Sequence, residues 1–211
     1  GEDCVCTRKA FEAMGVKIIS SKDGSELTIE GVGLKGLKPP KSALYLGNSG
    51  TSMRLLIGLL AGQSFSITLS GDPSLSNRPM KRVADPLRLM GAQIDGREGG
   101  NFAPISITGS KLKGITYEIP MASAQVKSAI LLAGLYASGQ TRVAEPERSR
   151  DHTEKFLKFF GADVTQKGPT VSIRAGKSLK ARSFAIAGDV SSAAFFMTAA
   201  VLVPRSKIVF R

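Results

Sequence analysis

The sequence has no tryptophan, only two cysteines and no apolar run that could cross a membrane. Its longest mostly apolar stretches, 129–137 and 193–203, fall short of the roughly 20 residues that a membrane-spanning helix needs. Cys4 and Cys6 are too close for a sound disulfide and offer at most half of a zinc site. The charged start of the chain lacks the apolar run of a signal peptide. We therefore expect a cytoplasmic protein with reduced thiols.

Patterns for hydrolytic and metal chemistry are also missing. His152 is the only histidine, and no serine elbow or matching acid accompanies it, so a catalytic triad has no support. No carboxylate pair stands out, and no cluster of metal-ligating residue types does either. The sequence therefore predicts no metal site.

Negative charge is scarce, because 17 acidic residues face 29 Lys and Arg, for a net charge of +12. Such a chain attracts anions, which include nucleic acid, acidic lipid and phosphorylated metabolites. Aromatic residues make up only 6% of the chain, which weakens the case for stacking on single-stranded bases. A basic nucleic-acid-binding module remains open as an alternative to a site for small anions.

An internal repeat runs through the chain. Helix-like patterns end at Gly15, Gly91 and Gly161, at successive offsets of 76 and 70, and glycine suits the left-handed end of a helix. An alternating strand follows each glycine, at Leu27–Ile29, Ile105–Ile107 and Val171–Ile173. The string Leu-Leu-Ala-Gly recurs at an offset of 72 in helices of mostly apolar residues, which we expect to be buried.

These repeats predict the architecture. Each unit has the order strand, helix, strand, helix, strand, strand. We expect an α/β fold (α+β in stricter schemes): one pseudo-threefold domain over 1–211, with buried helices and outer sheets. Its three βαβαββ units lie at about 1–69, 70–144 and 145–211. The chain lacks an initiator Met and ends inside an expected strand at 206–211, so we expect a segment of a longer protein.

Two arginines occupy equivalent places in this repeat. Arg78 and Arg150 are related by the same offset of 72, and each precedes an expected helix, at Pro79–Met90 and Asp151–Phe160. A helix N-terminus offers free N–H donors, and a guanidinium group matches phosphate and carboxylate oxygens. The spacing of Asp151 and Glu154 also predicts a capping box. The pair of arginines indicates an anion site, although solvated surface charges are the alternative.

The apolar helices begin with small polar residues that can also serve anions: Gly50-Thr51, Ser123 and Ser191. Repeat symmetry should bring several of these helix ends toward one face. A simple turn around Gly50 and a plain helix cap at Ser123 are the alternatives. Gln125 is harder to explain in this way, because a buried amide needs hydrogen-bond partners.

The order of these motifs resembles the 5-enolpyruvylshikimate-3-phosphate synthase family over nearly the whole chain. The motifs are Leu46–Thr51, Gly71-Asp72, Leu75, Arg78–Met80, Met121–Ser128, Ser149–Glu154, Gly188-Asp189 and Ser191–Ala193. The resemblance implies transfer of the enolpyruvyl group of phosphoenolpyruvate to the 5-hydroxyl of shikimate 3-phosphate, with release of phosphate. It implies no metal or organic cofactor, inhibition by glyphosate, a monomer, and a second domain of the same enzyme as partner.

The resemblance also assigns residues. Asn48, Gly50, Thr51 and Arg78 match the phosphoenolpyruvate and glyphosate side, and Ser123, Ala124 and Arg150 match the shikimate 3-phosphate side. Gln125 matches a residue that reaches both ligands and assists. No residue of this chain matches the catalytic Asp and Glu of the family, and its Lys–Ser–Arg segment is absent. We therefore expect the chain to be inactive by itself, with neither nucleic acid nor membrane as partner.

Overall fold

The computed structural model describes residues 1–210, which form two compact units, 1–180 and a second that begins at Ala181. The first unit contains all strands of the described residues and seven of their helices. Its helices are α1 (Glu2–Ala13), α2 (Gly50–Ala61), α3 (Pro73–Ser76), α4 (Lys81–Leu89), α5 (Arg97–Gly100), α6 (Ala124–Gly134) and α7 (His152–Phe159). The second unit contains α8 (Val190–Leu202). Within 1–210, no helix is long and apolar enough to cross a membrane.

Two four-stranded sheets have the same topology. The first has the order β3 (Leu44–Tyr45), β4 (Ser66–Ser70), β6 (Phe102–Thr108), β5 (Gln93–Gly96). The second has the order β7 (Thr116–Glu118), β8 (Gln140–Ala144), β10 (Thr170–Arg174), β9 (Asp163–Lys167). In each sheet the first pair is parallel and the other two pairs are antiparallel. The predicted order strand, helix, strand, helix, strand, strand is therefore confirmed twice.

The units of the repeat are shifted from the expected boundaries. The complete copies run over 44–108 and 116–174, and the equivalent helices α2 and α6 begin at Gly50 and Ala124, an offset of 74 and not 72. Before them, α1 is followed by the hairpin of β1 (Lys17–Ser20) and β2 (Leu27–Glu30), in the order of the second half of such a unit. The expected glycine helix ends are confirmed, since Gly15, Gly91 and Gly161 have φ of 87°, 97° and 92°.

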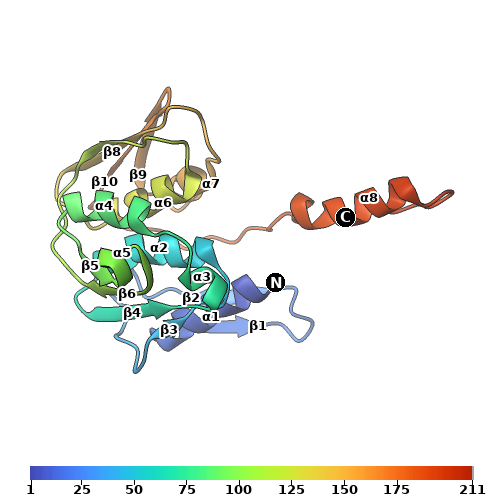
Figure 1. Ribbon diagram of the computed structural model, residues 1–211, viewed down its shortest axis with the longest axis horizontal. Coiled ribbons are helices and arrows are strands. Elements are labelled where there is room, and N and C mark those ends of the chain that lie inside the picture. The colour runs from blue at the N-terminus through green and yellow to red at the C-terminus, as the bar shows by residue number, and fades with distance from the viewer. Residues whose placement is uncertain (211) are drawn as a thin grey trace. The chain divides into compact units, whose positions relative to one another are not determined.

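The core of the first unit lies between the two sheets, where α2 and α6 run side by side (Figure 1). Most of their apolar residues are buried, as predicted for these helices, and Ile57, Leu60 and Ile130 are fully so. Gly58 permits this close approach, because a Cβ at that position would lie 2.2 Å from the carbonyl oxygen of Ala129. Each sheet turns one face inward; in β6, for example, burial alternates along the strand.

The C-terminal region differs in part from what the sequence predicted. The predicted third apolar helix forms as α8, but none of its residues is buried, and Phe195 and Val201 are 81% and 86% exposed. The second unit, as far as it is described, offers this helix no strand or further helix to pack against, and the single domain expected over 1–211 stays a prediction. The expected strand at 206–211 is irregular over 206–210, where no neighbouring strand pairs with it, and residue 211 lies outside the description.

Candidate anion-binding site

The loop before α2 builds the first part of the site. Ser49 caps α2 by accepting a hydrogen bond from the N–H of Ser52 at 3.2 Å, so the helix begins at Gly50 with its N-terminal turn in place. Asn48 projects from the same loop, is exposed, and donates from Nδ2 to Asp72 Oδ2 at 2.8 Å. The predicted residues of this loop therefore surround the positive end of a helix.

Arg78 reaches this loop from the segment between α3 and α4. Its guanidinium group donates to the carbonyl oxygen of Asn48 at 3.3 Å and to Asn48 Oδ1. A third, longer hydrogen bond goes to Ser74 Oγ at 3.4 Å. Asp72, which caps α3 by accepting from the N–H of Leu75 at 2.7 Å, holds the other end of the Asn48 side chain. Arg78 therefore contacts the loop that precedes α2, which carries residues assigned to the same predicted group.

Gln125 connects the N-termini of the two equivalent helices. Its Nε2 donates to Thr51 Oγ1 at 2.8 Å, and its Oε1 accepts from Arg54 Nη1 at 2.9 Å. The expectation that a partly buried amide at this position has partners is confirmed. Because Thr51 belongs to α2 and Gln125 to α6, the repeat brings these two helix ends together, as symmetry predicted.

Arg54 is the residue of the site that the sequence reasoning missed. It lies one turn into α2, and its guanidinium group also donates to the carbonyl oxygens of Gly50 at 3.4 Å and Pro79 at 3.3 Å. Burial lowers the pKa of Arg54 from its ordinary value, and the positive charges of Arg82 and Arg78 lower it further. Three guanidinium groups therefore lie close enough to repel one another, which is an arrangement that a bound anion relieves.

Gly50 leaves room between two of these groups. A Cβ at this position would lie 2.9 Å from Arg54 Nη1 and 3.2 Å from Arg78 Nη1. Both atoms are the ends of flexible side chains, so the substitution would displace the guanidinium groups and leave the helix backbone in place. Glycine is therefore suited to this position because it keeps the space between the two arginines open.

The second predicted group of residues is less tightly assembled. Ser123 caps α6 by accepting from the N–H of Val126 at 3.4 Å, and Ala124 begins the helix. Arg150 is exposed in the loop between β8 and α7 and makes no hydrogen bond or ion pair with any of residues 1–210. Ser191 belongs to the second unit. Ser123 and Ala124 thus lie beside Gln125, while the guanidinium group of Arg150 stays available within the described part of the chain.

The predicted capping box at α7 is wrong. Asp151 makes no side-chain capping bond; its Oδ1 pairs with Lys155 Nζ at 3.0 Å instead, which lowers the pKa of Asp151. Glu154 does not reach back to the helix start, because its side chain is buried against Lys127. Ion pairing therefore overrides the local capping pattern at this helix.

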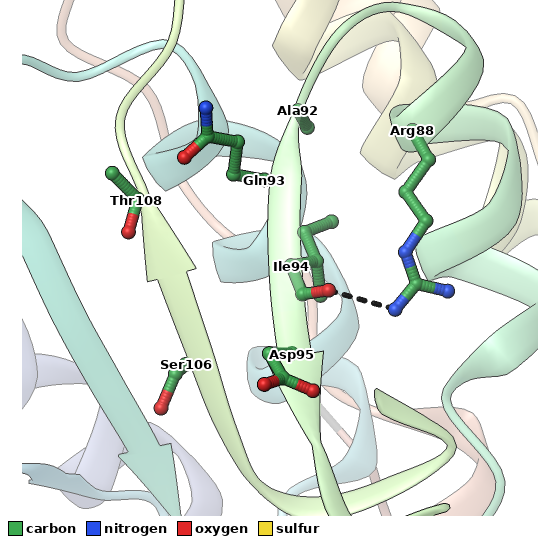
Figure 2. Close-up of a pocket in the computed structure, with 7 residues that line it drawn as sticks. All are labelled: Arg88, Ala92, Gln93, Ile94, Asp95, Ser106 and Thr108. Atoms are coloured by element: carbon green, nitrogen blue, oxygen red, sulfur yellow. Dashed lines mark hydrogen bonds between the residues drawn. The ribbon is translucent and has the colours of Figure 1, made fainter. Parts of the chain in front are cut away.

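Two other features are separate from this site. The pocket in Figure 2 lies beside β5 and β6 and contains none of the predicted site residues; its one arginine, Arg88, already donates to the carbonyl oxygen of Ile94 at 2.7 Å. Among residues 1–210, no three His, Cys, Asp or Glu side chains gather as metal ligands would. Cys4 and Cys6 are both free thiols, as expected.

Comparison with known proteins gives one family. The model of the family EPSP synthase (3-phosphoshikimate 1-carboxyvinyltransferase) matches residues 1–211. Curated relatives with the name 3-phosphoshikimate 1-carboxyvinyltransferase include those of Bacillus cytotoxicus, 56% identical, and Geobacter sp. strain M21, 57% identical. Each alignment covers 100% of this chain and 49% of the relative, so the chain spans about half the length of these proteins.

A solved structure agrees with this match. EPSP synthase from Acinetobacter baumannii superposes with a TM-score of 0.88 at 57% identity, over 95% of this chain and 45% of that one. The chain therefore belongs to the EPSP synthase (3-phosphoshikimate 1-carboxyvinyltransferase) family.

Proposed function

We propose that this chain is the half of a 3-phosphoshikimate 1-carboxyvinyltransferase that grips the two anionic substrates. In that reaction the enolpyruvyl group of phosphoenolpyruvate passes to the 5-hydroxyl of shikimate 3-phosphate, and phosphate leaves. The observation that carries the proposal is the bridge of Gln125 between Thr51 and Arg54, with Arg78 held at the same helix end. This arrangement places the side-chain amide of Gln125 among hydrogen-bond donors that could bind phosphoenolpyruvate and shikimate 3-phosphate side by side.

The residues divide into two groups around Gln125. Asn48, Gly50, Thr51 and Arg78 bind phosphoenolpyruvate, and glyphosate as an inhibitor in its place. Ser123, Ala124 (through its backbone) and Arg150 bind shikimate 3-phosphate, and Gln125 contacts both. The charged cluster of Arg54, Arg78 and Arg82 supports the first assignment, because the positive charges of Arg82 and Arg78 both lower the pKa of Arg54, and an anion bound beside them would offset this repulsion.

The chemistry of this half is positioning and charge stabilisation. Guanidinium groups and helix N-terminal N–H groups hold phosphate oxygens and stabilise the negative charge that grows on the leaving phosphate. Proton transfer to the enol carbon and from the hydroxyl requires acid and base groups at those atoms. We assign no such group to this chain and propose that the remaining half of the protein supplies them, in a monomeric enzyme of the cytoplasm. The free thiols support that location.

The nucleic-acid alternative has no support from the comparisons, because the family match covers every residue of the chain. A net charge of +12 would attract two anionic substrates as readily as a polynucleotide, so the charge does not favour the nucleic-acid alternative. Phosphorylated metabolites are therefore the ligands against which the site is to be tested.

Titration calorimetry with shikimate 3-phosphate tests the assignment. Arg150→Ala removes charge-assisted hydrogen bonds worth about 1.5–3 kcal/mol and should weaken binding by about 10- to 150-fold. Ser123→Ala should weaken it by about fivefold, and it also removes a helix cap, so its melting temperature is recorded alongside. Arg148→Ala, an exposed arginine of the same loop, is the matched control and should bind as the unaltered chain does. Unchanged affinity in Arg150→Ala would refute the assignment of Arg150.

A further inference from the structure

A lysine is buried in the core of the first unit, behind the candidate site. Lys127 lies in α6, and its side chain is only 1% exposed. Its Nζ lies 2.6 Å from Glu145 Oε2 and 2.7 Å from Glu154 Oε1. The two glutamate side chains are 3% and 2% exposed, so three charged groups share a site without access to water.

Packing alone does not require this ionic cluster. Burying charges has a large desolvation cost, and replacing a buried ion cluster by apolar residues of similar volume is often neutral or stabilising. The other copy of the repeat shows an apolar side chain at the equivalent position. Met53 is the fourth residue of α2, as Lys127 is the fourth residue of α6, and Met53 is fully buried. The first copy of the repeat thus fills the equivalent place with an apolar side chain. The cluster therefore calls for a role other than filling the core.

The cluster ties both ends of one loop to one ammonium group. Glu145 directly follows β8, and Glu154 lies in the first turn of α7. Ser149 Oγ donates to Glu145 Oε1 within the loop. A parallel link joins Ser128 Oγ of α6 to Thr153 Oγ1 at 2.7 Å. The segment 145–154, which carries Arg150 on its exposed side, is therefore fixed to α6 at its start and at its end.

The same helix presents the other residues of this part of the site. The N–H of Lys127 donates to the carbonyl oxygen of Ser123 at 3.1 Å, so Lys127 lies one helical turn after the residue that caps α6. We propose that Lys127 is a positioning residue: through Glu145 and Glu154 it holds the Arg150 loop in register with Ser123 and Gln125. This inference rests on the proposed binding of shikimate 3-phosphate, which these residues would grip together.

The test replaces the cluster without leaving an unpaired charge. In Lys127→Met/Glu145→Gln/Glu154→Leu the core keeps its volume, and the new amide at position 145 still accepts from Ser149. Circular dichroism and thermal melting establish that the variant is folded. We expect its affinity for shikimate 3-phosphate to fall by about tenfold, since Arg150 is no longer preorganised. Lys155→Met, which alters a mostly exposed lysine of α7, is the matched control and should leave the affinity unchanged.

A second comparison separates positioning from general stability. If the cluster acts through Arg150, the triple substitution should cause no further loss of affinity when Arg150→Ala is already present. Equal losses in both backgrounds would overturn the proposal, and so would a folded triple variant that binds like the unaltered chain. If Arg150→Ala itself leaves the affinity unchanged, the proposed function is at fault instead.

Glu154→Gln covers the case in which the triple variant does not fold. It keeps the shape of the side chain and leaves Lys127 paired with Glu145, but it weakens the link to α7. We expect amide hydrogen exchange at Lys155, whose N–H donates to the carbonyl oxygen of Asp151 at the end of the loop, to accelerate by about tenfold relative to the unaltered chain. We also expect affinity for shikimate 3-phosphate to fall several-fold. Exchange at the original rate, with the original affinity, would show that the loop does not depend on the cluster.

Discussion

Asp72 joins a helix cap to the predicted phosphate contact. It accepts from the N–H of Leu75 and from Asn48, whose carbonyl groups in turn accept from Arg78. These two hydrogen bonds, and then the charge of Arg78, lower the pKa of Asp72. A carboxylate with a lowered pKa stabilises the folded chain at pH values above its unfolded pKa of about 4, and this contribution is lost as the pH falls through the folded value.

Asp72→Asn should therefore cost stability at neutral pH and cost progressively less in acid. Asparagine caps helices about as well as aspartate, so the substitution removes the charge and keeps the cap. Urea denaturation between pH 7 and pH 3 measures the difference from the unaltered chain. We expect that difference to be largest near pH 7 and to shrink as the pH falls below about 4. A difference that stays constant over this range would contradict the role of the ionised form.

A single charged residue in an otherwise apolar helix is the sequence signal that could have identified Arg54 and Lys127 in advance. Arg54 is the one charged residue of α2, and Lys127 is the one charged residue of α6. Both helices were correctly predicted to be buried, and a charge in a buried helix needs a partner. The partners, Gln125 for one and Glu145 with Glu154 for the other, come from distant parts of the chain. Their identity could not be predicted from local sequence.

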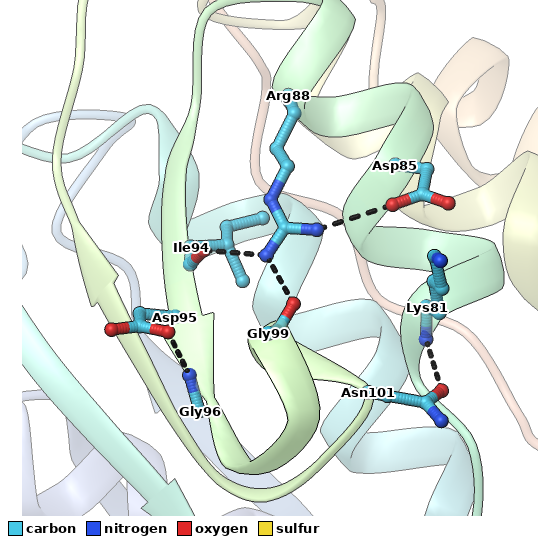
Figure 3. Close-up of polar contacts among 8 residues, drawn as sticks. All are labelled: Lys81, Asp85, Arg88, Ile94, Asp95, Gly96, Gly99 and Asn101. Carbon is cyan, nitrogen blue, oxygen red and sulfur yellow. Dashed lines mark hydrogen bonds and ion pairs between the residues drawn. The ribbon is translucent and has the colours of Figure 1, made fainter.

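At the scale of elements, Arg88 protects the free edge of a sheet. β5 is an edge strand, with β6 as its one neighbour. Arg88 Nη2 donates to the carbonyl oxygens of Ile94 in β5 and of Gly99 in the following turn, both at 2.7 Å, while Nη1 pairs with Asp85 at 3.1 Å (Figure 3). Glu98, Gly99 and Gly100 of that turn all have positive φ. One side chain thus stabilises an exposed edge and an unusual turn.

Arg88→Met should release this turn. The substitution keeps an apolar stem but leaves two carbonyl groups without their donor, at a cost of about 1–3 kcal/mol in the free energy of unfolding. Urea denaturation measures the loss, and limited proteolysis should show new cleavage near 96–100. Lys158→Met, at the corresponding last turn of α7, is the matched control and should change stability by less than about 0.5 kcal/mol. Equal effects of the two substitutions would argue against the role of Arg88.

The elements themselves were largely predictable because local patterns decide them. Alternation located β6 and β10, and glycine helix ends located α1, α4 and α7. The capping box at Asp151 failed because a buried ammonium group attracts Glu154 more strongly than a helix terminus does. The predicted offset of 72 between equivalent helices is wrong. It rested on the repeated Leu-Leu-Ala-Gly string, which shows only that the two helices share an apolar composition, whereas their N-caps, Ser49 and Ser123, are 74 residues apart. Caps, rather than apolar strings, give the true register of the repeat.

At the scale of the whole molecule, the apolar pattern of α8 predicted both a helix and its burial, and within the second unit only the helix is observed. An apolar pattern indicates that the helix surface favours contact with other apolar residues, but it does not identify the residues that supply this contact. For α2 and α6 the neighbours are each other and the two sheets, all within 1–180. Residues 181–210 form a unit of their own, in which α8 is exposed. The apolar surface that covers such a helix thus depends on long-range packing, which a periodic sequence pattern does not reveal.

Activity should depend on more than this chain. No proton-transfer group is assigned to this chain, and general acid and base groups contribute about 10²–10⁴-fold to a rate. In the presence of shikimate 3-phosphate, the chain alone should therefore release phosphate from phosphoenolpyruvate at least about 100-fold more slowly than the full-length protein. Adding the remaining half as a separate polypeptide should restore turnover in a concentration-dependent way. The same mixture with Arg150→Ala should lose at least about tenfold of the restored rate, because the proposed contact of Arg150 with shikimate 3-phosphate would be lost in either context. Turnover by the chain alone at the rate of the full-length protein would mean that the acid and base groups lie within these 211 residues.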